Sequence, residues 1–128
     1  MHKRTIKTSD APAAIGPYEQ AIGFGNFVFT SGQIALDPKT GEFLEDEIEQ
    51  ETERVLKNIE AVLKADGLSL ADVIKTTVYL ADLNHFARMN AVYESLFAGH
   101  KPARACVQVA ALPKGAKVEM DAIAAAKP

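Results

Sequence analysis

The sequence predicts an α+β fold in which a mixed β-sheet carries two helices packed on one face. Two segments, residues 47–66 and 86–97, place apolar side chains at helical spacing. Strand-like segments lie before, between and after these helices, an order that is typical of such a sheet. With 128 residues, 48% of them apolar, the chain is long enough for one core but short for two. We therefore expect a single domain spanning residues 1–128.

The first two strands are expected at residues 21–24 and 26–34, joined by a turn at Gly25–Asn26. Aromatic and β-branched residues, which favour strands, follow directly after this turn as the letters FVFT. The only basic cluster of the chain lies ahead of these strands, from His2 to Arg4. Because chain ends are commonly mobile, we expect this cluster to be exposed and partly frayed.

Both helices are predicted from apolar stripes and from signals at their ends. The first has acidic residues crowded between Glu45 and Glu53, where the helix dipole favours negative charge, and Gly67 as a left-handed cap. The second follows a capping segment at 82–84 and ends before Gly99. The two stripes consist of Ile48, Val55, Leu56, Ile59, Val62 and Leu63, and of Phe86, Met89, Val92, Tyr93, Leu96 and Phe97.

The strand between the helices, residues 73–81, separates two faces by alternation. One face consists of Val73, Lys75, Thr77 and Tyr79, and the other of Ile74, Thr76, Val78 and Leu80. We expect the second, more apolar face to meet the helices. The remaining face still carries Val and Tyr, so it is too apolar for full contact with water. Such a face indicates burial against other subunits, and hence a homo-oligomer.

Two closing strands, residues 103–109 and 117–124, carry charged residues in apolar surroundings. A loop with Pro and Gly joins them and can turn the chain, so the two strands can pair as a hairpin, in a register that the sequence leaves open. Alternation then places Arg104, Cys106 and Glu119 together on the sheet face that does not meet the helices. In one interpretation, Arg104 and Glu119 form an interfacial ion pair that fixes assembly geometry. In the other, they line a pocket at a subunit boundary, where the arginine binds a carboxylate and the glutamate handles a proton.

Composition excludes several classes of function. The net charge of −3 and the absence of a basic face argue against nucleic-acid binding. A single cysteine, Cys106, forms no intramolecular disulfide and suits a reducing compartment. No histidine lies in a segment placed beside it, and no Cys/His pair has zinc spacing, so we expect neither a thiolate nucleophile nor a metal site. The chain has no signal-peptide pattern and no apolar run that could span a bilayer, which predicts a cytoplasmic protein without a membrane partner.

Short motifs along nearly the whole chain resemble the RidA/YjgF family. The most specific is the closing signature, PARACV from Pro102, then Leu112–Pro113 and Val118–Met120. The other motifs, in order, are Ile15–Tyr18, Thr30–Ile34, Lys39–Gly41, Lys75–Val78, and Phe86 through Tyr93 with Asn90. The resemblance implies a chorismate-mutase-like fold and a homotrimer, with a central β-barrel, helices outside and clefts between subunits.

The resemblance also implies an activity, the hydrolysis of reactive 2-enamines and 2-imines such as 2-aminoacrylate. The products are 2-keto acids and ammonia. The substrates arise as by-products of pyridoxal-phosphate enzymes, but the deaminase itself is expected to need no cofactor. The expected partners are therefore a small imino or keto acid and further copies of the chain.

The family's site residues map onto positions of this chain. By similarity, Arg104 holds the substrate carboxylate, and Glu119 positions the attacking water and takes its proton. Tyr18 would cap the cleft, and Asn90 would reach it from the second helix. The remaining expected binding residues are Ser31 and Gly32, which would line the pocket, and Cys106, which would contribute mainly backbone groups and shape.

Two alternatives to the enzyme remain open at this point. A regulatory trimer could sense 2-keto or amino acids through Arg104 without catalysis, although a sensor has little need of Glu119. Ribonuclease or translation-inhibitor activity is also attached to this family by name. The acidic balance of the chain disfavours that alternative.

Overall fold

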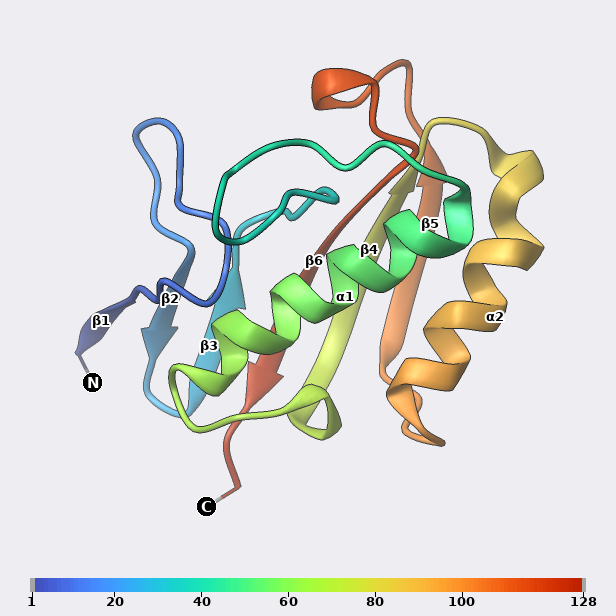
Figure 1. The fold of residues 1–128 in the computed structure, drawn as a ribbon. Helices are drawn as coiled ribbons and strands as arrows, with labels where there is room; N and C mark the ends of the chain where they lie inside the picture. The colour runs from blue at the N-terminus through green and yellow to red at the C-terminus, as the bar shows by residue number, and fades with distance from the viewer. Residues whose placement is uncertain (1, 128) are drawn as a thin grey trace.

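One mixed sheet and two helices make up the computed structural model, which describes residues 2–127 (Figure 1). Within this range the sheet has six strands in the order β1-β2-β3-β6-β4-β5, and the helices lie on one face. The strands are β1 (Lys3–Ile6), β2 (Ala21–Phe24), β3 (Phe27–Thr30), β4 (Val73–Leu80), β5 (Ala103–Gln108) and β6 (Val118–Ala125). The helices are α1 (Ile48–Lys64) and α2 (Phe86–Phe97). The predicted α+β architecture, with two helices on a mixed sheet, is confirmed.

The predicted hairpin between the two closing strands is wrong. β5 pairs with β4 in parallel, and β6 pairs antiparallel with both β3 and β4, so β4 lies between β5 and β6. A helix that crosses between two strands returns the chain in the same direction, and α2 is such a connection from β4 to β5. β6 takes an inner position because its alternate residues, from Val118 to Ala124, are fully buried against the helix layer.

The N-terminal residues from Lys3 onward are not frayed, which corrects that part of the expectation for this cluster, whereas His2 and Lys3 are exposed as expected. Lys3–Ile6 pairs antiparallel with β2, and Ile6 is buried in the core. The Arg4 guanidinium donates to Asp66 at 2.7 Å and to the carbonyl oxygen of Gly25 at 2.8 Å. These contacts tie the first strand to the turn between β2 and β3 and to the end of α1.

The predicted helices are confirmed, with the first beginning and ending within the expected range. The apolar stripe of α1 is buried without exception, and burial of such side chains contributes about 1.5–3 kcal/mol each. Gly67 follows this helix with a φ of +77°, a left-handed conformation that glycine adopts without strain. Asp82 accepts a hydrogen bond from the amide of Asn84, so it caps the single 3₁₀ turn that leads into α2.

A β-bulge changes the predicted faces of β4 at its first two residues. Val73 is fully buried and Ile74 is 45% exposed, the reverse of simple alternation, because the register against β6 shifts between Val73 and Lys75. Beyond the bulge the prediction holds. Thr76, Val78 and Leu80 face the helices, and the alternate residues lie on the free face.

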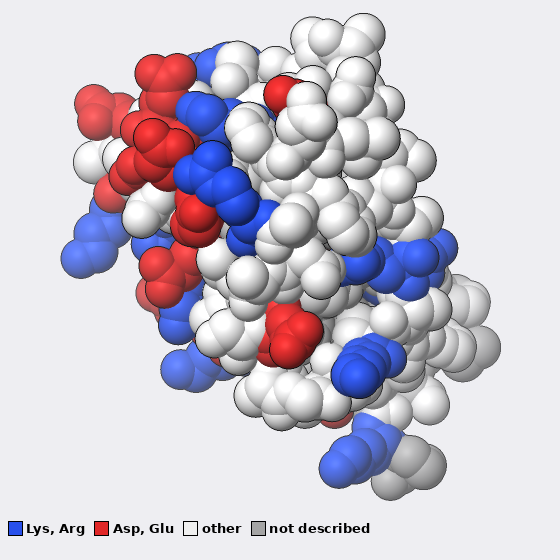
Figure 2. All heavy atoms as spheres, turned by 90° about the vertical axis from the view of Figure 1, so that its right-hand side faces the viewer, with Lys and Arg blue, Asp and Glu red and all other residues white. Residues whose placement is uncertain are grey.

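The free face of the sheet is largely apolar. Phe27, Phe29, Ile74 and Val107 are each about two-fifths exposed there, and the face meets no helix. Figure 2 views the edge at β5 and α2: charged side chains crowd the side on which the helices lie, and the opposite side is mostly uncharged. Large exposed apolar patches mark interaction surfaces, and the burial of this face against other subunits stays a prediction. Among residues 2–127, no helix has the length and apolar character needed to cross a membrane.

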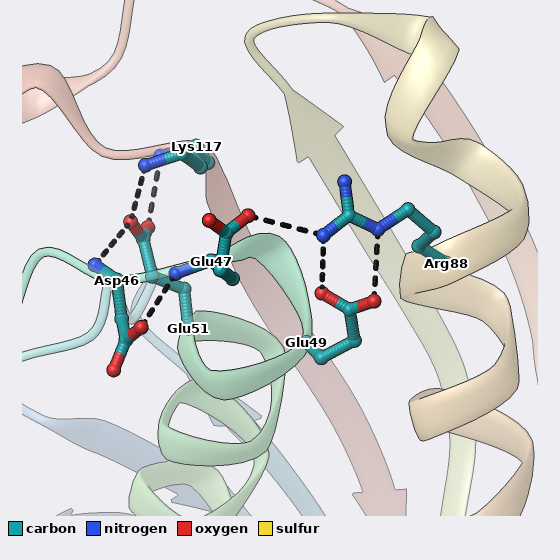
Figure 3. A network of polar contacts seen from close by, with 6 residues as sticks. All are labelled: Asp46, Glu47, Glu49, Glu51, Arg88 and Lys117. Carbon is teal, nitrogen blue, oxygen red and sulfur yellow. Dashed lines mark hydrogen bonds and ion pairs between the residues drawn. The ribbon is translucent and has the colours of Figure 1, made fainter.

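A buried carboxylate joins the beginning of α1 to the beginning of β6 (Figure 3). Glu51 has no exposed surface, and it accepts hydrogen bonds from the backbone amides of Lys117 at 2.9 Å and Asp46 at 3.3 Å. The ammonium of Lys117 lies 3.4 Å from the same carboxylate. Nearby, Arg88 of α2 forms ion pairs with Glu47 and Glu49. Glu51 therefore holds the segment that enters β6 just before Glu119.

The replacement Glu51→Ala is expected to destabilise the protein by about 1–3 kcal/mol, because it leaves two part-buried backbone amides without their acceptor. Glu51→Gln retains a side-chain oxygen and should cost less. Glu49→Ala is the matched control, since it removes an exposed ion pair that is worth about 0–1 kcal/mol. The measurement is the thermal unfolding midpoint at a fixed protein concentration, and equal midpoints for the two alanine variants would contradict the expectation.

Candidate active site

Arg104 lies on the helix side of the sheet. This corrects the prediction from the sequence, which placed it on the free face. It pairs with Thr76 of β4, and paired residues in neighbouring strands project from the same face. Its guanidinium carbon lies 4.8 Å from the centre of the Tyr93 ring and 5.4 Å from that of Phe86. Its Nη1 atom donates a 2.6 Å hydrogen bond to Oδ1 of Asn90. Aromatic faces and an amide therefore hold this cation while no carboxylate within residues 2–127 pairs with it.

Cys106 also lies on the helix side, which corrects its predicted place on the free face. It is opposite Val78, partly buried against the core. Burial raises the pKa of its thiol, and the nearby Arg104 lowers it by less. A raised pKa leaves the thiol protonated at neutral pH and hence a poor nucleophile. This argues against a thiolate nucleophile at Cys106, and its contribution of shape and backbone groups stays a prediction.

Arg104 lines a cavity of about 360 Å³ at the edge of the sheet. Its lining residues come from α2 and from the segment that leads into β5: Asn90, Tyr93, Glu94, Gly99, His100, Lys101, Pro102 and Arg104. The hydroxyl groups of Tyr93 and Thr76 are hydrogen-bonded at 2.6 Å, and burial raises the pKa of Tyr93. The tyrosine therefore stays neutral, and the one carboxylate among the lining residues, Glu94, is exposed.

Glu119 lies on the free face of the sheet, as predicted. It projects from β6 opposite Tyr79 of β4 and is half-buried. Burial raises the pKa of this carboxyl group, and the negative charge of Asp121 raises it further. Among residues 2–127 it has no ion pair. A carboxylate with raised proton affinity and no cationic partner is suited to accept and return a proton.

Glu119 lines a second cavity, of about 370 Å³, together with Tyr18 and Gly32. The Tyr18 ring is half exposed, and its hydroxyl accepts a 3.4 Å hydrogen bond from the amide of Ile15. Gly32 lies directly against the carboxylate of Glu119. The other lining residues are Pro12, Ala13, Ile15, Gln20, Gln33, Ile34, Leu36, Pro113 and Lys114. The structure thus brings three of the predicted site residues together.

Ser31 does not line this cavity, although it is next to Gly32. Its hydroxyl donates a 2.6 Å hydrogen bond to the backbone carbonyl of Glu19, and its amide donates to the carbonyl of Gln20. Both groups hold the segment after β3 against the segment that carries Tyr18. Ser31 therefore supports the wall of the cavity in the single chain.

Two buried glutamines that sequence reasoning missed shape the second cavity. The side chain of Gln20 donates to the carbonyls of Ala11 and Pro12 and accepts from the amide of Thr8. Gln33 exchanges two backbone hydrogen bonds with Met120, the residue after Glu119. Glutamine is a polar residue that is usually exposed, so the sequence does not indicate that these two are buried. Gln33 nevertheless lies inside one of the motifs that carry the family resemblance.

The predicted site residues therefore form two groups on opposite faces of one sheet. Arg104, Asn90 and Cys106 lie on the helix side, whereas Glu119 lies on the free side with Tyr18 and Gly32. The sheet separates the groups, so Arg104 and Glu119 of one chain form no ion pair and cannot hold the same small molecule.

Gly32→Ala is expected to lower any activity that needs Glu119. A Cβ atom at this position would lie 3.0 Å from Cδ of Glu119 and closer still to one carboxylate oxygen, so the side chain must move. A displacement of about 1 Å in a catalytic group can cost roughly 100-fold in rate. Gly23→Ala is the matched control, because its Cβ would displace the guanidinium of Arg4, away from the cavity. Equal activity of the two variants in a steady-state assay would contradict this expectation.

Comparison with known proteins gives close matches over the whole fold. The family model described as Endoribonuclease L-PSP matches residues 8–126. A RutC family protein of Pyrococcus abyssi is 54% identical over 124 residues, covering 97% of this chain and 98% of the relative. A protein of Salmonella typhimurium named 2-iminobutanoate/2-iminopropanoate deaminase is 51% identical over 124 residues, covering 94% and 96% of the two chains.

The fold matches solved structures equally well. TdcF of Escherichia coli, solved with bound serine, superimposes with a TM-score of 0.92 at 47% identity and covers 97% of this chain and 99% of its own. Both the sequence and the arrangement of the sheet and helices therefore agree with the resemblance found in the motifs. The chain belongs to the Endoribonuclease L-PSP family, also known as the YjgF/RidA family.

Proposed function

We propose that this protein is a hydrolytic deaminase that converts reactive 2-imino acids, and the 2-enamines that tautomerise to them, into 2-keto acids and ammonia. The observation that carries the proposal is the arginine of the first group: Arg104 is held by aromatic rings and an amide, without an acidic partner within residues 2–127. Its planar fork is therefore available for a substrate carboxylate. The relative named as a 2-iminobutanoate/2-iminopropanoate deaminase supports the same activity.

The proposed active unit is a homotrimer with a central β-barrel, in which the Arg104 group of one copy faces the Glu119 group of the next. The placement of the two groups on opposite faces of one sheet supports this arrangement, because each chain offers both halves but cannot use them together. The exposed apolar residues of the free face, such as Phe29, support burial in an assembly. A cleft between copies would also lower the entropic cost of bringing substrate and water together.

The proposed mechanism needs only a carboxylate clamp and one proton carrier. Arg104 holds the substrate carboxylate, which places the electrophilic imine carbon near Glu119 of the neighbouring copy. The ionised Glu119 takes a proton from water as the water oxygen bonds to the imine carbon, forming a carbinolamine. The carbinolamine formed from the protonated imine is neutral, so the same carboxyl group can return the proton to its amine. The carbon–nitrogen bond then breaks as Glu119 takes the hydroxyl proton. The 2-keto acid leaves, and ammonia carries this proton away as ammonium. An enamine first gains a proton on carbon and becomes the imine.

A trapping experiment tests this function directly. An amino-acid oxidase or a serine/threonine dehydratase generates the imine in the presence of semicarbazide, with and without this protein. We expect the protein to suppress semicarbazone formation from the imine while the total 2-keto acid is unchanged, because it consumes the imine before the trap does. Unchanged semicarbazone with every amino acid tested would reject the enzyme function for those substrates.

Ligand sensing is a second candidate, supported by the relative that was solved with bound serine. A sensor would use Arg104 to hold the carboxylate of an amino or keto acid without turnover. Glu119 separates the candidates, because binding alone does not need a carboxylate beside the reacting carbon. RNA cleavage is not proposed, because a net charge of −3 disfavours a polyanionic substrate.

A further inference from the structure

A second carboxylate accompanies Glu119 on the free face of β6. Asp121 lies two residues further along the strand, so both side chains project from the same face. Tyr79 lies opposite Glu119 in the neighbouring strand, and its hydroxyl donates a 3.1 Å hydrogen bond to Oδ2 of Asp121. The tyrosine side chain thus runs diagonally across the two strands and holds Asp121 beside Glu119.

The other groups around Glu119 leave this interaction uncompensated in the described chain. Tyr18 and Lys114 share its cavity, but neither forms an ion pair with it within residues 2–127. Lys117, two residues earlier, directs its ammonium to Glu51. The residues of β5 on the free face, Ala103, Ala105 and Val107, do not titrate.

The ionisation of Asp121 is set by opposing influences. Burial has the largest effect and leaves the pKa of Asp121 raised, although the hydrogen bond from Tyr79 and the charge of Lys75 lower it in part. These two partners favour the charged form of Asp121. A charged neighbour of the same sign makes ionisation of Glu119 less favourable, so Glu119 holds its proton more tightly.

We propose that Asp121 is a positioning residue of the active site: held by Tyr79, its negative charge acts through Glu119 and makes that carboxylate a stronger base toward the attacking water. The inference rests on the proposed deaminase function. A general base works best when its pKa lies near the operating pH. The pKa of an isolated carboxyl group lies well below neutral pH, which makes it a weak base. Asp121 itself would touch neither the substrate nor the attacking water.

The test is the pH profile of kcat/KM for the wild type and three variants. Charged Asp121 raises the pKa of Glu119, so Asp121→Asn should lower it. The acidic limb of the profile should then move to lower pH, and the plateau rate should fall because the base is weaker. Asp121→Glu retains the charge and should keep the limb near its wild-type position. Tyr79→Phe should move the limb in the same direction as Asp121→Asn but less far, because Asp121 then loses a partner of its charged form.

The possible outcomes separate this inference from the function on which it rests. A wild type without deaminase activity at every pH would overturn the proposed function, and the inference with it. An active wild type whose acidic limb is the same in Asp121→Asn would overturn the inference alone. Titration of the Glu119 carboxyl carbon by NMR gives a second readout that a merely structural role of Asp121 would not move. The inference predicts a lower pKa of Glu119 in Asp121→Asn, and an unchanged value would reject it.

Discussion

The substitution Arg104→Ala is expected to abolish imine deamination while the protein remains folded and assembled. The guanidinium would supply two charge-assisted hydrogen bonds to the substrate carboxylate, and each is worth about 1.5–3 kcal/mol. Their loss corresponds to at least roughly a 100-fold decrease in kcat/KM. The semicarbazide assay measures the loss of activity, and light scattering after size exclusion measures the assembly.

Two further arginine variants separate substrate binding from general charge and packing. Arg104→Lys retains the charge but not the planar fork, so it should recover only part of the activity. Arg88→Ala removes another arginine near the helix face, one that pairs with Glu47 and Glu49, and it should leave activity unchanged. If Arg104→Ala instead dissociates the assembly, the interfacial ion-pair interpretation is favoured over the substrate-binding one.

The substitution Glu119→Gln should slow turnover by roughly 10²–10⁴-fold, the usual cost of a lost acid or base. The amide has nearly the shape of the carboxyl group but cannot take a proton from water. Binding of a 2-keto acid, measured by calorimetry, should persist because Arg104 is intact. The variant thus separates chemistry from binding at the same site.

The pH dependence of the wild type provides an independent check on Glu119. Its pKa is raised by burial and by Asp121, so the ionised base should be lost at a higher pH than for an exposed carboxyl group. Activity should therefore fall as the pH decreases through that pKa, and Glu119→Gln should lack this acidic limb. Glu42→Gln, on an exposed loop, is the matched control and should retain the wild-type profile. Full turnover in Glu119→Gln would reject the role of Glu119 as the proton carrier of the reaction.

The elements of the fold with strong local signals were predictable from the sequence. The helical spacing of the apolar residues from Ile48 to Leu63 predicts a helix, and the aromatic and β-branched residues after Asn26 predict a strand. Both predictions are confirmed. The first strand was missed because its residues are mostly polar, as is typical of a mobile chain end. The contact that holds Arg4 joins it to Asp66, 62 residues away in sequence, so no local pattern indicates it. The exchange of Val73 and Ile74 was missed because a bulge depends on the partner strand.

The sequence by itself determined the family of the chain, the two helices and the place of Glu119 on the free sheet face. Only the tertiary structure decided that Arg104 lies on the other face. Alternation along a strand establishes which residues share a face, but the partner strand decides which face that is. The crossover through α2 pairs β5 with β4 in parallel and places Arg104 beside Thr76. That pairing joins residues far apart in sequence, so no local pattern records it.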